Sequence, residues 1–441
     1  MPASVIDIQK YRRAIANAST YKVKGKVTEL TGLVVKAVVP NVRVGELCLI
    51  NSYYRKQPIK AEVVGFKDNS VLLMPLGDLE GIGPGNDVIP TGSCLMVPVG
   101  YELLGRVLDG LGDPLDTDRY GPLSTTEFYP VHASPPDAMT RRRITQPISV
   151  GVKAIDAMLT VGEGQRIGLF AAAGVGKSVL MGMIARNTEA DINVICLVGE
   201  RGRELRDFLE QDLGEEGLAR SVVICSTSDQ PSLVRSKAAY AATAIAEYFR
   251  DKGKKVLFVM DSVTRFARAL REIGLAVGEP PARQGFTPSV FSTLPKLLER
   301  SGNSDKGSIT AFYTVLVEGD DMNEPVADEV RSILDGHVIL SRDLANRGQY
   351  PAINVSESIS RVMTNIIDEE HIEASRKLKE VVANYEKERD LILIGAYESG
   401  SNPSVDYAIE KIDEVNNFLK QGIGDKIDFE EAVEGLKAIF N

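Results

Sequence analysis

Residues 166–178 read Arg-Ile-Gly-Leu-Phe-Ala-Ala-Ala-Gly-Val-Gly-Lys-Ser, an apolar run that leads into a small, glycine-rich loop. This order predicts a buried strand, a tight turn whose successive backbone N–H groups cradle phosphate oxygens, and a helix that starts at the loop. Such a loop needs a strand and a helix to hold its two ends. The central part of the chain is therefore predicted to be an α/β domain.

The loop is expected to bind a nucleotide through a short run of residues: Ala173, Gly174, Val175, Gly176, Lys177, Ser178 and Val179. Lys177 would reach the terminal phosphates, and the Ser178 hydroxyl would hold Mg²⁺. The usual pattern begins with glycine where this chain has Ala171, and alanine fits there only if its φ is negative. The alternative is a glycine-rich turn that carries an exposed lysine and binds nothing.

A second predicted strand, 256–261, ends in a carboxylate, Asp261. At the end of a parallel strand this residue would orient a water or Ser178 around Mg²⁺. An aspartate in this place can also be a simple helix cap, here before Ser262. Together, the loop and Asp261 predict binding of ATP with Mg²⁺ but do not by themselves predict hydrolysis.

Hydrolysis also needs a group that positions and polarises the attacking water. The predicted strand 193–198 leads into Gly199-Glu-Arg-Gly-Arg-Glu204, which puts Glu200 just past a strand end on the phosphate side of the sheet. A carboxylate there can accept a hydrogen bond from a water in line with the γ-phosphate. Glu204 is the weaker candidate, because it falls further into the following helix. The alternative for both is a solvent-facing charge cluster.

The stretch 21–98 alternates short β-rich runs with glycine and proline. Short strands at this spacing, with little helical periodicity, predict a small closed β-barrel. Five runs are expected to be strands: 24–30, 32–39, 46–50, 60–66 and 70–75.

Residues 1–20 place Val5, Ile8, Tyr11 and Ile15 at helical spacing among basic residues. This segment is predicted to be a helix that docks on a partner or a membrane surface. The alternative is a frayed N-terminal helix.

Residues 99–366 are predicted to form one nucleotide-binding domain, whose first part, 99–136, is a turn-rich linker. Apolar strands then alternate with helices, among them 179–186, 203–213 and 231–250, which predicts a mostly parallel sheet covered on both faces. Residues 367–441 are predicted to form a charged helical domain. The expected sheet strands are 166–170, 193–198, 221–225, 256–260, 308–316 and 337–340.

The composition suits a cytoplasmic globular protein: 44% of the 441 residues are hydrophobic, and no apolar run reaches the length of a membrane span. The net charge of −10 gives no general reason to expect nucleic-acid binding. The four cysteines lie far apart and only three histidines occur, so buried thiols are expected rather than a zinc site.

Eight segments together follow one known pattern: 104–116, 151–156, 170–178, 199–204, 261–268, 288–295, 319–325 and 351–360. The similarity as a whole runs from about Val23 to the C-terminus. The chain resembles the flagellar and type III secretion ATPase family, homologues of the catalytic subunit of rotary ATPases. The export ATPases resemble this chain in having a small residue at the position of Ala171. The last segment matches a signature that the family shares with rotary subunits.

The resemblance implies roles for particular residues. Lys177 and Ser178 match the family's phosphate and Mg²⁺ contacts, and Glu200 matches its catalytic carboxylate, which Arg201 follows. Arg265 matches a phosphate-facing arginine.

Two further matches have plain alternatives. Arg361 matches an arginine finger that enters a neighbouring subunit's site, and Tyr350 matches an aromatic that packs on adenine. Arg361 can also be an intrachain ion pair and Tyr350 an ordinary core aromatic. An arginine at a γ-phosphoryl transition state is worth roughly 10³–10⁵ in rate. Because one chain holds both the Glu200 and the Arg361 features, a homohexameric ring could build every site from identical copies.

The implied function is Mg²⁺-dependent ATP hydrolysis that energises type III protein export, by chaperone release or substrate unfolding, for a flagellum or an injectisome. The implied partners are a stator or negative regulator at the N-terminal segment, a central stalk, chaperone–substrate complexes at the helical tail, and the export gate at the cytoplasmic face of the inner membrane.

Three alternatives stay open. A rotary ATP synthase subunit is disfavoured by the alanine-rich loop, segment 319–325 and the short tail. A ring nucleic-acid translocase is disfavoured because the barrel has few aromatics and the chain has no Trp and a negative charge. A nucleotide-binding subunit without activity is disfavoured because Lys177, Glu200 and Asp261 are all present.

Overall fold

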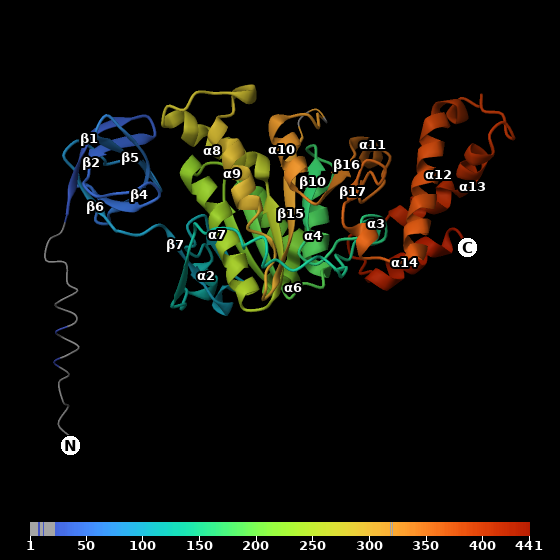
Figure 1. Cartoon of the computed structure of the whole chain (residues 1–441), viewed down its shortest axis with the longest axis horizontal. Coiled ribbons are helices and arrows are strands. Elements are labelled where there is room, and N and C mark those ends of the chain that lie inside the picture. The colour runs from blue at the N-terminus through green and yellow to red at the C-terminus, as the bar shows by residue number, and fades with distance from the viewer. Residues whose placement is uncertain (1–7, 9–11, 13–22, 318, 320) are drawn as a thin grey trace, which may run out of the picture. The chain divides into compact units, whose positions relative to one another are not determined.

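The computed structural model describes residues 8, 12, 23–317, 319 and 321–441. They belong to two compact units, of which the first ends at Leu95 and the second begins at Met96 (Figure 1). The predicted docking segment 1–20 lies outside the described residues except for Ile8 and Arg12, so its role stays a prediction.

The first unit is a closed antiparallel barrel with the strand order β1-β2-β5-β4-β3-β6. Alternate side chains point inward, and Val35, Ile50 and Leu73 are fully buried in its core. The strands are β1 (Gly25–Thr31), β2 (Val34–Val38), β3 (Leu47–Asn51), β4 (Ile59–Lys67), β5 (Ser70–Pro75) and β6 (Asp87–Pro90).

The expectation of five barrel strands was one short. The missing strand is β6, which pairs with both β1 and β3 and so closes the barrel. It has four residues, of which Val88 is buried and lies opposite Gly25 and Ile50. So short a run, directly after the glycines 81, 83 and 85, gives no local β pattern, and only closure of the barrel requires it.

The second unit is built on a nine-stranded sheet with the order β17-β16-β10-β15-β13-β11-β12-β8, in which β14 also pairs with β15. The strands from β16 to β8 are parallel, whereas β17 and β14 pair antiparallel. The strands are β8 (Val107–Asp109), β10 (Arg166–Ala171), β11 (Ile192–Val198), β12 (Ser221–Ser226), β13 (Lys255–Asp261), β14 (Gly302–Asn303), β15 (Ser308–Leu316), β16 (Gly336–Leu340) and β17 (Ile359–Ser360).

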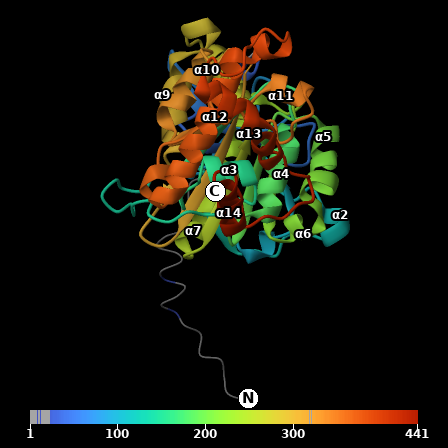
Figure 2. The ribbon, with the colours of Figure 1, turned by 90° about the vertical axis from the view of Figure 1, so that its right-hand side faces the viewer.

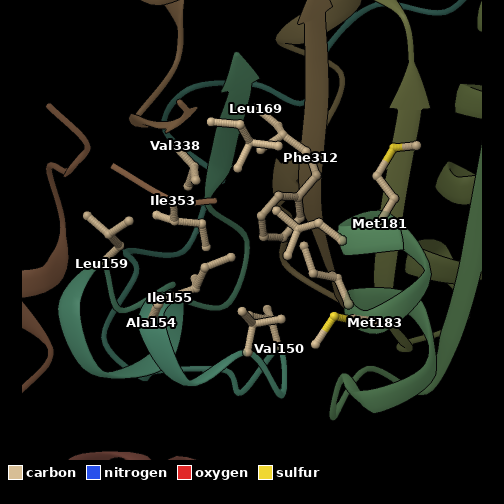
Figure 3. Packing of buried hydrophobic residues seen from close by; sticks show 14 of the residues in the cluster. Val150, Ala154, Ile155, Leu159, Leu169, Met181, Met183, Phe312, Val338 and Ile353 are labelled. Atoms are coloured by element: carbon tan, nitrogen blue, oxygen red, sulfur yellow. The ribbon is translucent and has the colours of Figure 1, made fainter. Parts of the chain in front are cut away.

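Helices cover both faces of this sheet, because the central strands are apolar on both sides. On one face, the long helix α7 contacts β11, β12 and β13 and packs against α8. On the other face, Leu169, Phe312 and Val338 pack toward α3 and α4, through Ile155 and Met183 (Figure 3). The helices of this layer pair are α3 (Lys153–Met158), α4 (Lys177–Asn187), α7 (Ser232–Asp251), α8 (Val263–Ala276), α9 (Pro288–Leu298), α10 (Pro325–Ile333) and α11 (Arg342–Asn346).

Three C-terminal helices, α12 (Glu369–Leu393), α13 (Pro403–Leu419) and α14 (Phe429–Ala438), complete the second unit. All three contact α3, on the side of the sheet that carries α4 (Figure 2). The Asp368 side chain caps α12 by accepting a hydrogen bond from the His371 N–H at 2.7 Å. The predicted fold class is thus confirmed: an N-terminal barrel, a central mostly parallel α/β sheet and C-terminal helices.

The stretch 99–136 is more ordered than the predicted linker. Its β8 pairs with β12 and forms an edge of the large sheet, and its β9 (Glu127–Pro130) pairs with β7 (Met96–Val99). Two short helices, η1 (Tyr101–Leu103) and α2 (Thr117–Tyr120), lie between these strands. The strands are only three and four residues long, so glycine and proline dominate the sequence pattern, and the pairing depends on distant partners.

The single helix expected over 203–213 is two elements in the structure, α5 (Gly202–Asp207) and the π-helical turn η2 (Phe208–Leu213). A further helix, α6 (Gly214–Ala219), follows directly. The wider turn lies against α4 at Gly182, where an added Cβ would come within 2.5 Å of the Asp212 carbonyl oxygen. Tertiary contact between η2 and α4 therefore accompanies a local geometry that helical propensity does not predict.

We expect Gly182→Ala to destabilise the second unit by about 1–3 kcal/mol, because the new methyl group overlaps the η2 backbone. The thermal midpoint of the purified chain should fall by several degrees. Gly202→Ala is the matched control, since an added Cβ there meets no atom within 4 Å. Equal midpoints for Gly182→Ala and the unchanged chain would contradict this packing.

Candidate active site

The glycine-rich loop joins the end of β10 at Ala171 to the start of α4 at Lys177. Gly174 and Gly176 have φ of +80° and +88°, which explains why these positions are glycine. Ala171 is the last residue of β10, so its strand backbone accepts a side chain where the usual pattern has glycine. Within the loop, Val175 is buried and anchors the turn, whereas Ala173, Gly174 and Ser178 are exposed.

Lys177 and Asp261 meet where the loop and the carboxyl end of β13 come together. The Lys177 ammonium contacts Asp261 Oδ1 as an ion pair. Thr314, on β15 between β10 and β13, donates a hydrogen bond from Oγ1 to the same Oδ1 at 2.7 Å. The structure thus brings two of the predicted residues together around one carboxylate that is almost fully buried.

Glu200 lies just past β11, the neighbour of β13, as the sequence predicted. Arg265, in the first turn of α8, holds it: the guanidinium donates to Glu200 Oε2 at 3.2 Å and to the Gly199 carbonyl oxygen at 2.6 Å. The backbone also fixes the turn, since the Gly199 N–H donates to the Ser226 carbonyl at 2.6 Å. Glu200 is 9% exposed, whereas Glu204 and Arg201 are solvent-exposed on α5 and at its start.

Burial raises the pKa of Glu200 to about 7, and the negative charge of Asp261 acts in the same direction. The cations of Lys177 and Arg265 act in the opposite direction and keep the rise moderate. The pKa of Glu204 is lowered, first by its hydrogen bond with Glu200. Of these two carboxyls, Glu200 is therefore the one whose charge changes near neutral pH, which suits a proton acceptor.

Tyr350 lies beside the loop rather than in the core, with 47% of its surface exposed. Its ring carbons lie 3.6 Å from the position that a Cβ on Gly176 would occupy. A mostly apolar cavity of about 200 Å³ opens there, between the start of α4 and the segment after β16. It is lined by Val175, Gly176, Val179, Leu180, Met183, Leu340, Tyr350, Pro351, Ala352, Gln421 and Ile423.

Arg361 lies at the opposite end of the sheet from the loop. It follows β17, which pairs with the first residues of β16, and its N–H donates to the Asp335 carbonyl oxygen at 3.0 Å. The Asp335 carboxylate in turn pairs with Arg166, the first residue of β10. The Arg361 side chain is exposed, and one of its guanidinium nitrogens donates weakly to the Arg331 carbonyl at 3.4 Å. The structure therefore does not bring Arg361 to Lys177 of the same chain.

Three residues of this region were missed by the sequence reasoning. Thr314 had been assigned only to a buried strand, and no motif singles it out. Gln421 and Ile423 lie beyond the nucleotide domain in sequence, in the loop after α13, where Gln421 accepts from the Lys153 N–H at 2.7 Å. The contact of this loop with the cavity is long-range, so no local signal could have revealed it.

The oxygen atoms of Ser178, at the start of α4, and of Asp261, at the end of β13, fit a magnesium ion that is shared with phosphates. The Ser178 hydroxyl and the Asp261 carboxylate are oxygen ligands, which Mg²⁺ prefers, and a Mg²⁺ bound with nucleotide needs only one or two protein ligands. No cluster of three His, Cys, Asp or Glu suited to hold an ion by itself occurs among the described residues.

Three family profiles match consecutive parts of the chain. The ATP synthase alpha/beta family beta-barrel domain matches residues 27–92, and the nucleotide-binding domain of the same family matches residues 151–360. The T3SS EscN ATPase C-terminal domain matches residues 367–438.

Curated relatives are similar along nearly the whole length. The flagellum-specific ATP synthase of Bacillus subtilis (strain 168) is 55% identical over 430 residues, which cover 96% of this chain and 97% of the relative. The type 3 secretion system ATPase of Xanthomonas euvesicatoria is 51% identical, with 97% and 96% covered. The chain belongs to the flagellar and type III secretion ATPase family.

A solved structure of a family member agrees with the fold. The assembled ATPase EscN from the type III secretion system of enteropathogenic E. coli superposes with a TM-score of 0.88 at 45% identity, covering 95% of this chain and 100% of EscN. This family is related to the alpha and beta subunits of ATP synthase. The chain is thus an ATP-binding ATPase of type III secretion or flagellar export, as the sequence resemblance implied.

We expect Glu200→Gln to stabilise this ATPase at pH 8. The folded pKa of about 7 exceeds the unfolded value near 4.5, so protonation of Glu200 stabilises the fold fully below about pH 4.5 and no longer does so above pH 7. The permanently neutral Gln keeps that contribution, which is about 3 kcal/mol at most. Thermal midpoints measured from pH 5.5 to 8.5 should show a gap that widens as the pH rises.

Glu204→Gln is the control with the opposite sign, because the pKa of Glu204 is lowered and its ionised form stabilises the fold. At pH 8 its midpoint should not exceed that of the unchanged chain. A gap between Glu200→Gln and the unchanged chain that does not vary with pH would contradict the raised pKa.

Proposed function

We propose that this ATPase carries out Mg²⁺-dependent ATP hydrolysis at sites between the subunits of a homohexameric ring and so energises type III protein export. The observation that carries the proposal is the position of Arg361, at the far end of the sheet from the loop of its own chain. An exposed arginine in this place can serve a phosphate only in a neighbouring copy.

The separation follows from the register of the strands. β10 and β16 are parallel, and Ala171 at the loop pairs with Leu340, whereas β17 pairs with the opposite end of β16 at Gly336. Each strand residue advances about 3.3 Å, so roughly 13 Å of sheet separates the two ends. An arginine side chain does not span that distance, and the loop's own ends are fixed by β10 and α4.

Within one chain, each residue around the phosphate loop would have a separate role. Lys177 would leave Asp261 and bind the terminal phosphates, and Arg265 would stabilise charge beside Glu200. Ionised Glu200 would accept a hydrogen bond from the attacking water and hold it in line. Tyr350 and the apolar cavity beside Gly176 would hold the adenine.

Magnesium, when bound, would supply positive charge to the phosphate oxygens during transfer. Ser178 would hold it directly, and Asp261 would orient one of its waters. Asp261 is the last residue of β13, and Ser178 lies in the first turn of α4, after the loop that follows β10. Both therefore lie at the carboxyl ends of the parallel strands, where α/β sheets bind their ligands.

Solved structures of one relative support the assembly and the central stalk. EscN has been solved as an assembled ATPase and in complex with its central stalk EscO, and the latter structure superposes on this chain with a TM-score of 0.87. We propose the same kind of assembly here, with a homohexamer around a central stalk. A stator or negative regulator would bind the N-terminal segment, and chaperone–substrate complexes would bind the C-terminal helices and be released or unfolded.

The site of action we propose is the cytoplasmic face of the inner membrane, through peripheral contact with the export gate. No helix in the described parts of the chain is both long and apolar enough to cross a membrane. Flagellar and type III secretion relatives match almost equally well, so both export systems fit. We propose no nucleic-acid partner for this function.

Glu200→Gln tests the assignment of the water-positioning residue. We expect turnover to fall at least about 10²–10⁴-fold, because the amide cannot accept the proton, while ATP binding is retained. Steady-state phosphate release and equilibrium binding of a fluorescent ATP analogue measure the two effects. Glu204→Gln is the matched control, and it should keep turnover within a few-fold. Comparable turnover in Glu200→Gln would move the role elsewhere.

A further inference from the structure

We infer that Thr314 is a positioning residue for the magnesium-associated carboxylate Asp261. This inference rests on the metal role proposed for Asp261 and goes beyond it, because none of the eight short segments that carry the family resemblance includes Thr314. The threonine hydroxyl would hold the carboxylate in place when Lys177 leaves it for a phosphate.

The sheet order places Thr314 at the centre of the site. β15 lies between β10, which delivers the phosphate loop, and β13, which delivers Asp261. Met260 pairs with Tyr313, so the next residues along, Asp261 and Thr314, lie side by side at the carboxyl ends of their strands. On the other side of β15, Thr314 pairs with Leu169 of β10. Thr314 therefore lies between the strand that leads into the phosphate loop and the strand that ends in the proposed metal ligand Asp261.

The contact itself is short and dry. The Thr314 hydroxyl donates to Asp261 Oδ1 at 2.7 Å, Thr314 is 0% exposed and Asp261 is 2% exposed. A hydrogen bond to a charged acceptor is worth more than a neutral one, and a buried carboxylate that loses a donor is strongly destabilised. The hydroxyl therefore limits the directions in which the Asp261 carboxylate can turn.

Lys177 and Thr314 share Oδ1, but only one of these contacts can persist during the reaction. The Lys177 ammonium contacts Oδ1 in this structure and must turn toward the terminal phosphates when a nucleotide binds. The Thr314 side chain is enclosed in the sheet and has no such second role. Its hydrogen bond would keep Oδ1 engaged and leave Oδ2 available for the magnesium that Asp261 is proposed to serve.

A purely structural threonine is the competing explanation, and the same strand offers a control for it. Thr310 is also buried, at 1% exposure, and its Oγ1 accepts a hydrogen bond from the Gly164 N–H at 2.9 Å. It lies four residues before Thr314, about 13 Å away along the strand, and so far from Asp261. Thr310→Val removes a buried hydroxyl of the same kind without touching the site.

The test is the effect of Mg²⁺ on nucleotide affinity, measured as equilibrium binding of a fluorescent ADP to the full chain in MgCl₂ and in EDTA. We expect Thr314→Val to lose about tenfold of the Mg²⁺-dependent gain in affinity, while its binding in EDTA stays unchanged. Thr314→Ser, which keeps the hydroxyl, and Thr310→Val should both retain the gain. Thr314→Ala should repeat the loss, and thermal midpoints identify any variant that fails to fold.

The outcomes separate this inference from the proposed function. A folded Thr314→Val or Thr314→Ala chain with the full Mg²⁺-dependent gain would overturn the role of Thr314. If Asp261→Asn loses the gain in the same experiment, the metal role of Asp261 stands and only the inference fails. If Asp261→Asn also keeps it, the metal assignment itself is wrong and the inference falls with it.

Discussion

The site depends on one constraint: the carboxyl ends of neighbouring parallel strands lie side by side. Strands β10, β15, β13 and β11 are neighbours and all run in the same direction. Their carboxyl ends therefore deliver Lys177, Thr314, Asp261 and Glu200 to one place, although these residues are separated by up to 137 positions in sequence. Strand β17 pairs antiparallel with the first residues of β16 and so brings Arg361 to the amino ends of the parallel strands. In the proposed ring, one sheet would thus present half of a site at each end of its strands.

Ion pairs offset the cost of burying two carboxylates at these strand ends. Asp261 and Glu200 are almost fully buried, and each is matched by a cation, Lys177 and Arg265 respectively. Removal of the cation from such a pair leaves a buried carboxylate charge without compensation, which is far more destabilising than the pair itself is stabilising. A phosphate that draws both cations away would leave the carboxylates to a metal, a water or the Thr314 hydroxyl. In the structure, each of the two buried carboxylates thus has a cation beside it, and Asp261 has the Thr314 hydroxyl as well.

Sequence patterns predicted the parts of the structure that depend on local order. The loop at 171–178, the strand ends before Glu200 and Asp261, and the helices after residue 366 all follow from runs of apolar residues, glycines and charges that are contiguous in the chain. The patterns failed where an element exists because of a distant partner. Strand β6 is defined by barrel closure, β8 by pairing with β12, and the π-helical η2 lies packed on α4.

The same distinction holds within the candidate site. Lys177 and Glu200 lie in recognisable motifs, whereas Thr314 was indistinguishable from its buried neighbours until the strand order was known. Gln421 reaches the cavity only because α14 and the loop before it fold back onto α3. The catalytic roles stay predictions, and so does the proposal that Arg361 of one copy acts in the site of the next.

Mixing two inactive variants tests most directly whether each site is built from two copies. Glu200→Gln and Arg361→Ala chains should each be nearly inactive alone. In an equal mixture, a site that takes Glu200 from one variant and Arg361 from the other is complete, so random assembly should restore about a quarter of the unchanged activity. Mixing Glu200→Gln with the Glu200→Gln/Arg361→Ala double variant should restore none. A mixture of the two single variants that stays as inactive as either alone would contradict the account.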